Sequence, residues 1–132
     1  MSLKDYSDED DYYTQEFEKE GVVSIWVGLT DNANDPEELD ALQDLCGVGY
    51  YELDNQEANC FDFNLVTLQE LLEDISYSKS FMIDALDRAR EKGLSEARWV
   101  IVQYEFEYNP SKVKREVSDD PVFLGCFSYV AE

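Results

Sequence analysis

The segment Val22–Leu29 carries apolar side chains on both of its alternating faces. Successive side chains of a strand point to opposite faces of a sheet, so this segment needs cover on both sides. An apolar run of this length bounded by polar residues is typical of a buried strand. We therefore predict that Val22–Leu29 forms a central strand of the fold.

Later segments of the chain show the periodicities of helices and strands. Asp35 suits a helix N-cap and is followed by Pro36, while Thr67 and Glu70 match the spacing of a capping box. Leucines at helical spacing follow both starts, and glycines end the helical patterns. The sequence thus predicts helices over residues 36–46, 67–75 and 79–92, and strands over Trp99–Tyr108 and Val122–Val130.

The order of these elements is β-α-(β)-α-α-β-β. The uncertain middle part has two short candidate strands, Gly49–Glu52 and Cys60–Phe63, with an acidic loop between them. Because strands concentrate at the end of the chain, the order favours an α+β fold with a mainly antiparallel sheet over a parallel wound sheet. We expect one domain over residues 20–132, preceded by a flexible acidic arm over residues 1–19.

The strand expected at Trp99–Tyr108 has one continuous apolar face. That face holds Val100, Val102, Tyr104, Phe106 and Tyr108. The opposite face begins with Trp99 and Ile101 and then turns polar, with Gln103, Glu105 and Glu107. Strict alternation therefore predicts that these last three side chains are solvated. Trp26 and Trp99 lie in apolar strands, and we expect both in the core.

Net charge is the second strong constraint. The chain has 31 acidic and 10 basic residues, a formal charge of −21, and thirteen of the acids lie from Asp31 to Asp74 without a single base between them. A charge of magnitude about 2–8 is enough for the solubility of a small domain. The excess causes self-repulsion and predicts a strongly basic protein partner. It disfavours anionic membranes and nucleic acids as partners.

The chain has no histidine. This excludes a histidine general base, a Ser-His-Asp triad and zinc held by histidines of this chain. Glu105 and Glu107 could resemble a glycosidase acid pair, but solvated strand residues explain them better. The acidic and amide residues Asp31, Asn32, Asn34, Asp35 and Glu37 lack the spacing of a calcium loop. We therefore expect no enzyme, cofactor or metal site; carboxylate catalysis is the least favoured alternative.

The cysteines and the absence of sorting signals bear on location. Cys46, Cys60 and Cys126 are odd in number and widely spaced, and no signal peptide or membrane-length apolar run is visible. These features favour a reducing cytoplasm with buried or inert thiols.

Tyrosines among the acidic residues are candidate partner-binding groups, because aromatic anchors are enriched at interfaces. Half-buried tyrosines that support a loop are an equally good explanation. The candidate binding residues are Asp31, Tyr50, Tyr51, Glu52, Asp54, Asp62, Asp74 and Tyr77.

Several strings of the sequence resemble one bacterial family in the same order. They are Val23–Gly28, Asp35–Leu39, Ser76–Phe81, Tyr104–Tyr108 and Phe123–Tyr129. Together they resemble the immunity protein 22 family, whose members are thought to neutralise toxins of polymorphic toxin systems. The resemblance implies an immunity protein that binds a cognate toxin, and the charge favours a basic toxin domain, a nuclease for example, whose active site is occluded. The alternative is an acidic mimic of nucleic acid that inhibits another DNA- or RNA-binding protein.

Overall fold

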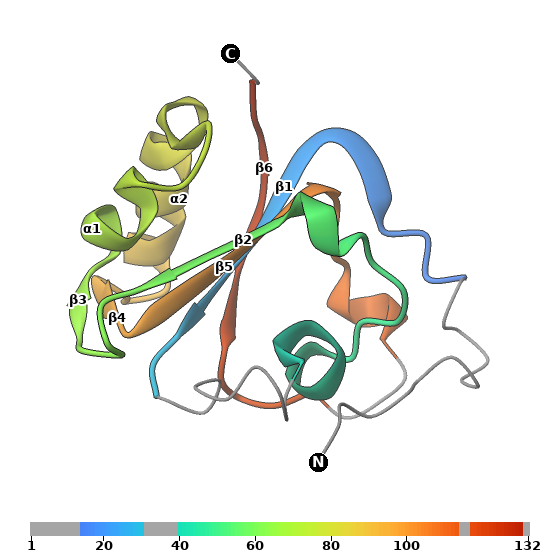
Figure 1. Cartoon of the computed structure of the whole chain (residues 1–132), viewed down its shortest axis with the longest axis horizontal. Helices are drawn as coiled ribbons and strands as arrows, with labels where there is room; N and C mark the ends of the chain where they lie inside the picture. The colour runs from blue at the N-terminus through green and yellow to red at the C-terminus, as the bar shows by residue number, and fades with distance from the viewer. Residues whose placement is uncertain (1–13, 31–39, 114–116, 131–132) are drawn as a thin grey trace.

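A four-stranded antiparallel sheet forms the centre of the protein (Figure 1). The computed structural model describes residues 14–30, 40–113 and 117–130. The strand order is β2-β5-β1-β6. The strands are β1 (Glu18–Gly28), β2 (Gln56–Cys60), β5 (Trp99–Phe106) and β6 (Val122–Ser128). β1 pairs with β5 on one side and β6 on the other, which confirms the central strand predicted at Val22–Leu29.

Two helices cover one face of this sheet. They are α1 (Leu68–Glu73) and α2 (Met82–Glu91), accompanied by a small sheet of β3 (Val66–Thr67) and β4 (Glu96–Ala97). α1 begins where the capping box predicted, because the Thr67 hydroxyl accepts a hydrogen bond from the Glu70 backbone N–H at 3.2 Å. Buried leucines of α1 and alanines of α2 pack on Val23, Ile25 and Val27 of β1. This layer is the larger hydrophobic core.

The opposite face is covered by irregular segments. They are a π-helical turn, η1 (Ala41–Leu45), and the chain around Phe17. Elsewhere, the described residues form the 3₁₀ turns η2 (Leu53–Asn55), η3 (Ser78–Ser80) and η4 (Pro110–Lys112). Trp26 and Trp99 are 1% and 3% exposed and lie in this second core, as predicted. The sheet with a core on each face confirms the α+β class of a single domain.

The helix predicted over residues 36–46 is not continuous. Asp40 is extended, with φ −101° and ψ 108°, and its side chain caps the turn of η1 by accepting from the Gln43 backbone N–H at 3.1 Å. An aspartate that accepts a backbone N–H in this way favours a helix start over a helix interior. The expected N-cap, Asp35, lies outside the described residues. Gly47 follows η1 with φ +72°, in agreement with the predicted stop.

The prediction of two short strands at Gly49–Glu52 and Cys60–Phe63 is wrong. Strand β2 instead occupies Gln56–Cys60, the segment interpreted as a loop, and Asp62 and Phe63 form a turn with φ near +55° and +59°. β2 is an edge strand paired only with β5 among the described strands. Its polar side chains suit the exposed edge, so no apolar alternation marks it in the sequence.

The predicted faces of the Trp99–Tyr108 strand are correct only up to Tyr104. Glu105 has φ +56°, and the next residues change faces: Tyr104 packs in the larger core, whereas Phe106 and Tyr108 pack in the second core. A bulge of this kind interrupts the two-residue period. Gln103, expected in solvent, is 1% exposed.

The acidic arm stays a prediction over residues 1–13, which lie outside the described residues. Closer to the domain, Gln15 and Phe17 are 6% and 3% exposed. The Gln15 side chain donates to the carbonyl of Gly47 at 3.0 Å and accepts from the Gly49 N–H at 2.6 Å. Ordered packing therefore begins before residue 20.

Candidate functional site

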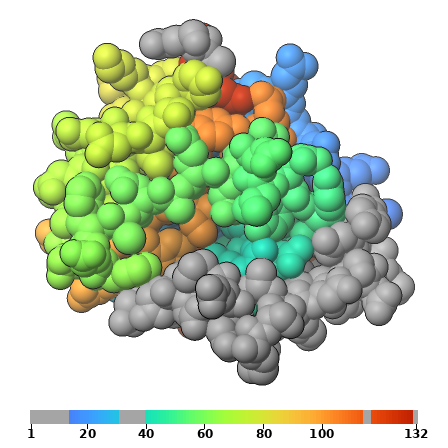
Figure 2. Space-filling model, viewed as in Figure 1, coloured from blue at the N-terminus to red at the C-terminus, as the bar shows by residue number. Residues whose placement is uncertain are grey.

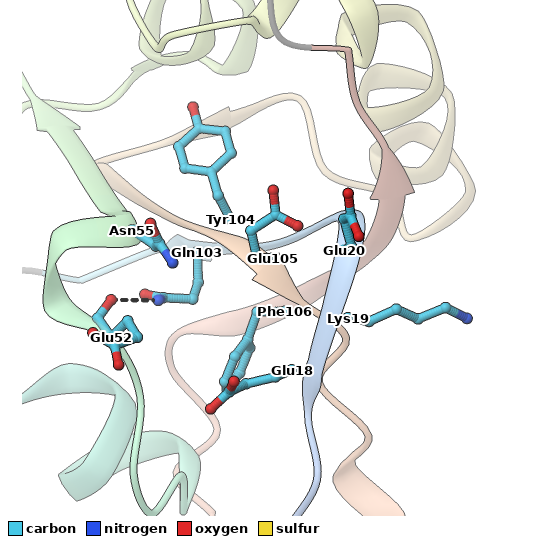
Figure 3. Close-up of a pocket in the computed structure, with 9 residues that line it drawn as sticks. All are labelled: Glu18, Lys19, Glu20, Glu52, Asn55, Gln103, Tyr104, Glu105 and Phe106. Carbon is cyan, nitrogen blue, oxygen red and sulfur yellow. Dashed lines mark hydrogen bonds between the residues drawn. The ribbon is translucent and has the colours of Figure 1, made fainter.

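A surface hollow of about 230 Å³ lies where β1, β5 and the η2 turn meet. Figure 3 shows the side chains around it, which come from three separate parts of the chain. The lining residues are Glu18, Lys19, Glu20, Glu52, Asn55, Gln103, Tyr104, Glu105 and Phe106. This hollow brings several carboxylates together from separate parts of the chain, so we take it as the candidate functional site.

The hollow forms because β1 and β5 lose their regular register. Glu18 pairs with Phe106, but Val23 pairs with Tyr104, so four residues of β1 face the single residue Glu105. Gly21 adopts φ +79° within the extra length, a conformation that glycine takes without steric cost. Its backbone N–H donates to Glu105 Oε2 at 2.7 Å. The bulge is therefore held open by a specific hydrogen bond.

Negative charge predominates around the hollow. Four carboxylates line it, from Glu18, Glu20, Glu52 and Glu105. Lys19, the single cation among the described lining residues, points away from the others in Figure 3 and pairs with Glu107 at 3.2 Å. Carboxylates gathered in a concave surface focus a negative potential. The site is suited to a guanidinium or ammonium group.

The floor of the hollow is uncharged and buried. The Gln103 side chain donates from Nε2 to the backbone carbonyl of Glu52 at 2.8 Å, as the dashed line in Figure 3 shows. Its Oε1 accepts a hydrogen bond from the side-chain Nε2 of Gln56 at 3.4 Å. These contacts connect β5 to the η2 turn and fix the position of the Glu52 rim.

Tyr104 lines the hollow and belongs to a cluster of three tyrosines with Tyr77 and Tyr129. Tyr77 stacks on Tyr129 with 5.9 Å between ring centroids, and both meet the Tyr104 ring edge to face. The Tyr104 hydroxyl donates to Glu57 Oε2 at 2.6 Å. Burial, and then the hydrogen bond to Glu57, raises the pKa of Tyr104 well above its usual value. Tyr77 is the outermost of the three, 40% exposed.

Part of the predicted binding surface lies at this hollow. Tyr50 is 38% exposed and its hydroxyl donates to the Glu52 carboxylate on the rim. Asp54 is exposed in η2, next to Asn55. Tyr77 lies next to the hollow, because its ring contacts the ring of Tyr104, which lines the hollow. Tyr51 differs, because it is half-buried and donates to Asp40 Oδ2 at 2.7 Å, where it supports a loop.

The remaining candidates are dispersed. Asp62 lies in the turn that follows β2, beyond the end of the strand farther from η2. Asp74 is the exposed C-cap residue of α1. Asp31 lies outside the described residues. Sequence reasoning missed the lining residues Glu18, Glu20, Asn55 and Gln103, and it placed Glu105 in solvent.

Other chemistry receives little support from the described part of the chain. No three Asp, Glu or Cys side chains there converge on a metal-binding position, and no helix there is long and apolar enough to cross a membrane. The residues weighed for calcium, 31–37, lie outside it. Burial raises the pKa of the Cys46 and Cys126 thiols, which makes them less reactive, whereas Cys60 is exposed.

A comparison with known protein families identifies the family of this chain. The family model of Immunity protein 22 matches residues 23–130, a stretch that contains all five of the resembling strings. The chain belongs to the immunity protein 22 family. No curated protein and no solved structure matches it. Proteins of an immunity family neutralise a toxin, so this member has a toxin protein as its partner.

Proposed function

We propose that this immunity protein neutralises a cationic toxin domain by docking the acidic hollow onto a basic side chain beside the toxin's active site. The observation that carries the proposal is that four glutamates line one hollow whose lysine points away from the other lining side chains. A buried guanidinium would exchange its water for hydrogen bonds to these carboxylates, which are among the stronger hydrogen bonds in proteins.

The rim supplies apolar contact beside the charge. Leu53 is 66% exposed on η2 and Tyr50 is 38% exposed. Such side chains bury area when a partner closes over the hollow, and buried anchors set dissociation rates. The charges act earlier, because opposite potentials steer the encounter and raise the association rate.

The mechanism is occlusion without catalysis. If the toxin is a nuclease, the carboxylates of the hollow take the places of nucleic acid phosphates in its cleft. The family is generally non-catalytic, and the chain has no histidine to serve as a general base. Inhibition therefore depends on how much of the cleft is covered and for how long.

Surface kinetics against the cognate toxin domain, made catalytically inactive, test this proposal. The variants Glu20→Lys and Glu52→Lys reverse charges at the hollow, and Glu96→Lys in β4 makes the same change of net charge elsewhere. We expect the first two variants to associate at least ~10-fold more slowly at low salt, with a flatter salt dependence, and the control to change little.

The tyrosine and leucine of the rim give the complementary result. Tyr50→Ala and Leu53→Ala should mainly raise the dissociation rate, by about tenfold if each loses ~1.4 kcal/mol of binding. Association that is indifferent to salt, or equal slowing by Glu96→Lys, would show that the hollow is not the contact site.

A further inference from the structure

The outer edge of β2 has no strand partner among the described residues. β2 pairs with β5 on its inner edge and ends the sheet order on that side. The Gln56 backbone N–H donates to the Leu53 carbonyl of η2. Other described hydrogen bonds of β2 involve side chains, such as the Asn59 amide to the Leu71 carbonyl at 2.9 Å. Backbone N–H and C=O groups on this edge can therefore accept another strand. β2 crosses the near face of the molecule in Figures 1 and 2.

Exposed apolar side chains stand at both ends of this edge. Leu53, 66% exposed, precedes β2, whereas Phe61 and Leu65, 41% and 49% exposed, follow it. The space-filling view shows the segments before and after β2 on the same uncovered face (Figure 2). A strand laid along β2 would have an apolar contact at each end.

The negative charge around the outer edge of β2 indicates which kind of strand could pair with it. Glu52, Asp54 and Asp62 are exposed at the ends of β2, and the chain has no base between Asp31 and Asp74. A second copy of this protein, with a charge of −21, would be repelled. β2 itself has no lysine or proline, the residues that commonly block strand addition at an edge.

We propose that an extended, basic segment of the toxin adds to the sheet as a fifth strand beside β2. This rests on the proposed function and deepens it, since it states how the toxin backbone is held while its basic side chains reach the acidic ends of the edge. Main-chain pairing supplies affinity, and the side chains that alternate along the added strand supply selectivity.

Amide hydrogen exchange measured by NMR tests the pairing directly. The protein is compared alone and with a catalytically inactive form of its cognate toxin domain. We expect alternate β2 amides, those that point outward, to exchange at least ~10-fold more slowly in the complex. Tight binding with unchanged β2 exchange would overturn strand addition and leave the proposed function intact. Absence of any complex would overturn both.

Proline variants give a second test. Adjacent N–H groups of a strand point to opposite edges, so Ala58→Pro and Asn59→Pro place the ring on different edges of β2. Asn59→Ala controls for the lost Asn59 side chain. We expect the proline variant that keeps the wild-type unfolding midpoint to bind the toxin at least ~10-fold more weakly. Unchanged affinity would overturn the proposal, as would protection of β2 that depends on the concentration of this protein alone.

Discussion

The backbone N–H of Gly21 donates a hydrogen bond of 2.7 Å to the carboxylate of Glu105, although 84 residues separate them in the chain. The other oxygen of the same carboxylate accepts from the Tyr129 hydroxyl. One side chain thus connects β1, β5 and the end of β6 at the point where the hollow opens. Glu105 does this from a left-handed backbone conformation that costs a non-glycine residue about 1–2 kcal/mol.

We expect Glu105→Ala to lower the free energy of unfolding by about 1–3 kcal/mol, because the Gly21 N–H and Tyr129 hydroxyl lose their acceptor. Glu105→Gly loses the same acceptor but relieves the backbone strain at φ +56°. The glycine variant should therefore be more stable than the alanine variant, the reverse of the usual order in strands. Urea unfolding of the three proteins measures both differences. An alanine variant as stable as the wild type would contradict the role of this carboxylate.

A methyl group at Gly28 would overlap the indole ring of Trp99, which is 3% exposed. We expect Gly28→Ala to destabilise the protein by about 1–3 kcal/mol or more through overpacking. Trp99→Ala should cost about 3–5 kcal/mol on its own. The double variant should cost less than the sum of the two, because the methyl group then fills part of the space. Additive losses in denaturant unfolding would argue that the two residues do not share that space.

Alkaline pH should unfold the protein partly through Tyr129. Burial, followed by the hydrogen bond to Glu105, raises the pKa of Tyr129 from 10.0 to about 12. Between these values the unfolded chain loses the phenolic proton before the folded one. The stabilisation present below pH 10 is therefore lost as the pH rises through about 12. Tyr129→Phe should give a flatter fall of the unfolding free energy over this range, and an identical slope would contradict the prediction.

Added salt should stabilise the free protein. A formal charge of −21 on 132 residues is self-repulsive, and the screening length falls from about 30 Å at 0.01 M to about 10 Å at 0.1 M. We expect the unfolding midpoint to rise over that interval. Sodium chloride and tetramethylammonium chloride at equal ionic strength should act alike, since screening does not depend on the identity of the cation. A rise with sodium alone would indicate a bound ion instead.

The regular parts of the fold were predictable because local pattern and burial agree in them. Val22–Leu29 is apolar on both faces and lies at the centre of the sheet, and the Thr67 cap sets the start of α1. β2 was missed because Gln56–Cys60 is held by pairing with β5 rather than by its own apolar pattern. Glu105 was misplaced because nothing in a two-residue period signals a bulge.

The candidate site was predictable only in part for a related reason. Tyr50, Glu52 and Asp54 are neighbours in the chain, so the acidic stretch with tyrosines pointed to them. Glu18, Glu20 and Gln103 reach the same hollow through strand pairing across more than 80 residues. Only the register of β1 against β5 brings them together, and that register depends on the bulge.

The division of the hollow into a buried floor and an exposed rim has an evolutionary consequence. Gln103, Tyr104 and Phe106 belong to the interior, where substitutions are costly, whereas Glu18, Glu20 and Glu52 are exposed. Exchanges at exposed positions usually change stability by less than about 0.5 kcal/mol. If the rim contacts the toxin as proposed, its exposed residues can change along with the toxin surface while the buried floor beneath them is retained.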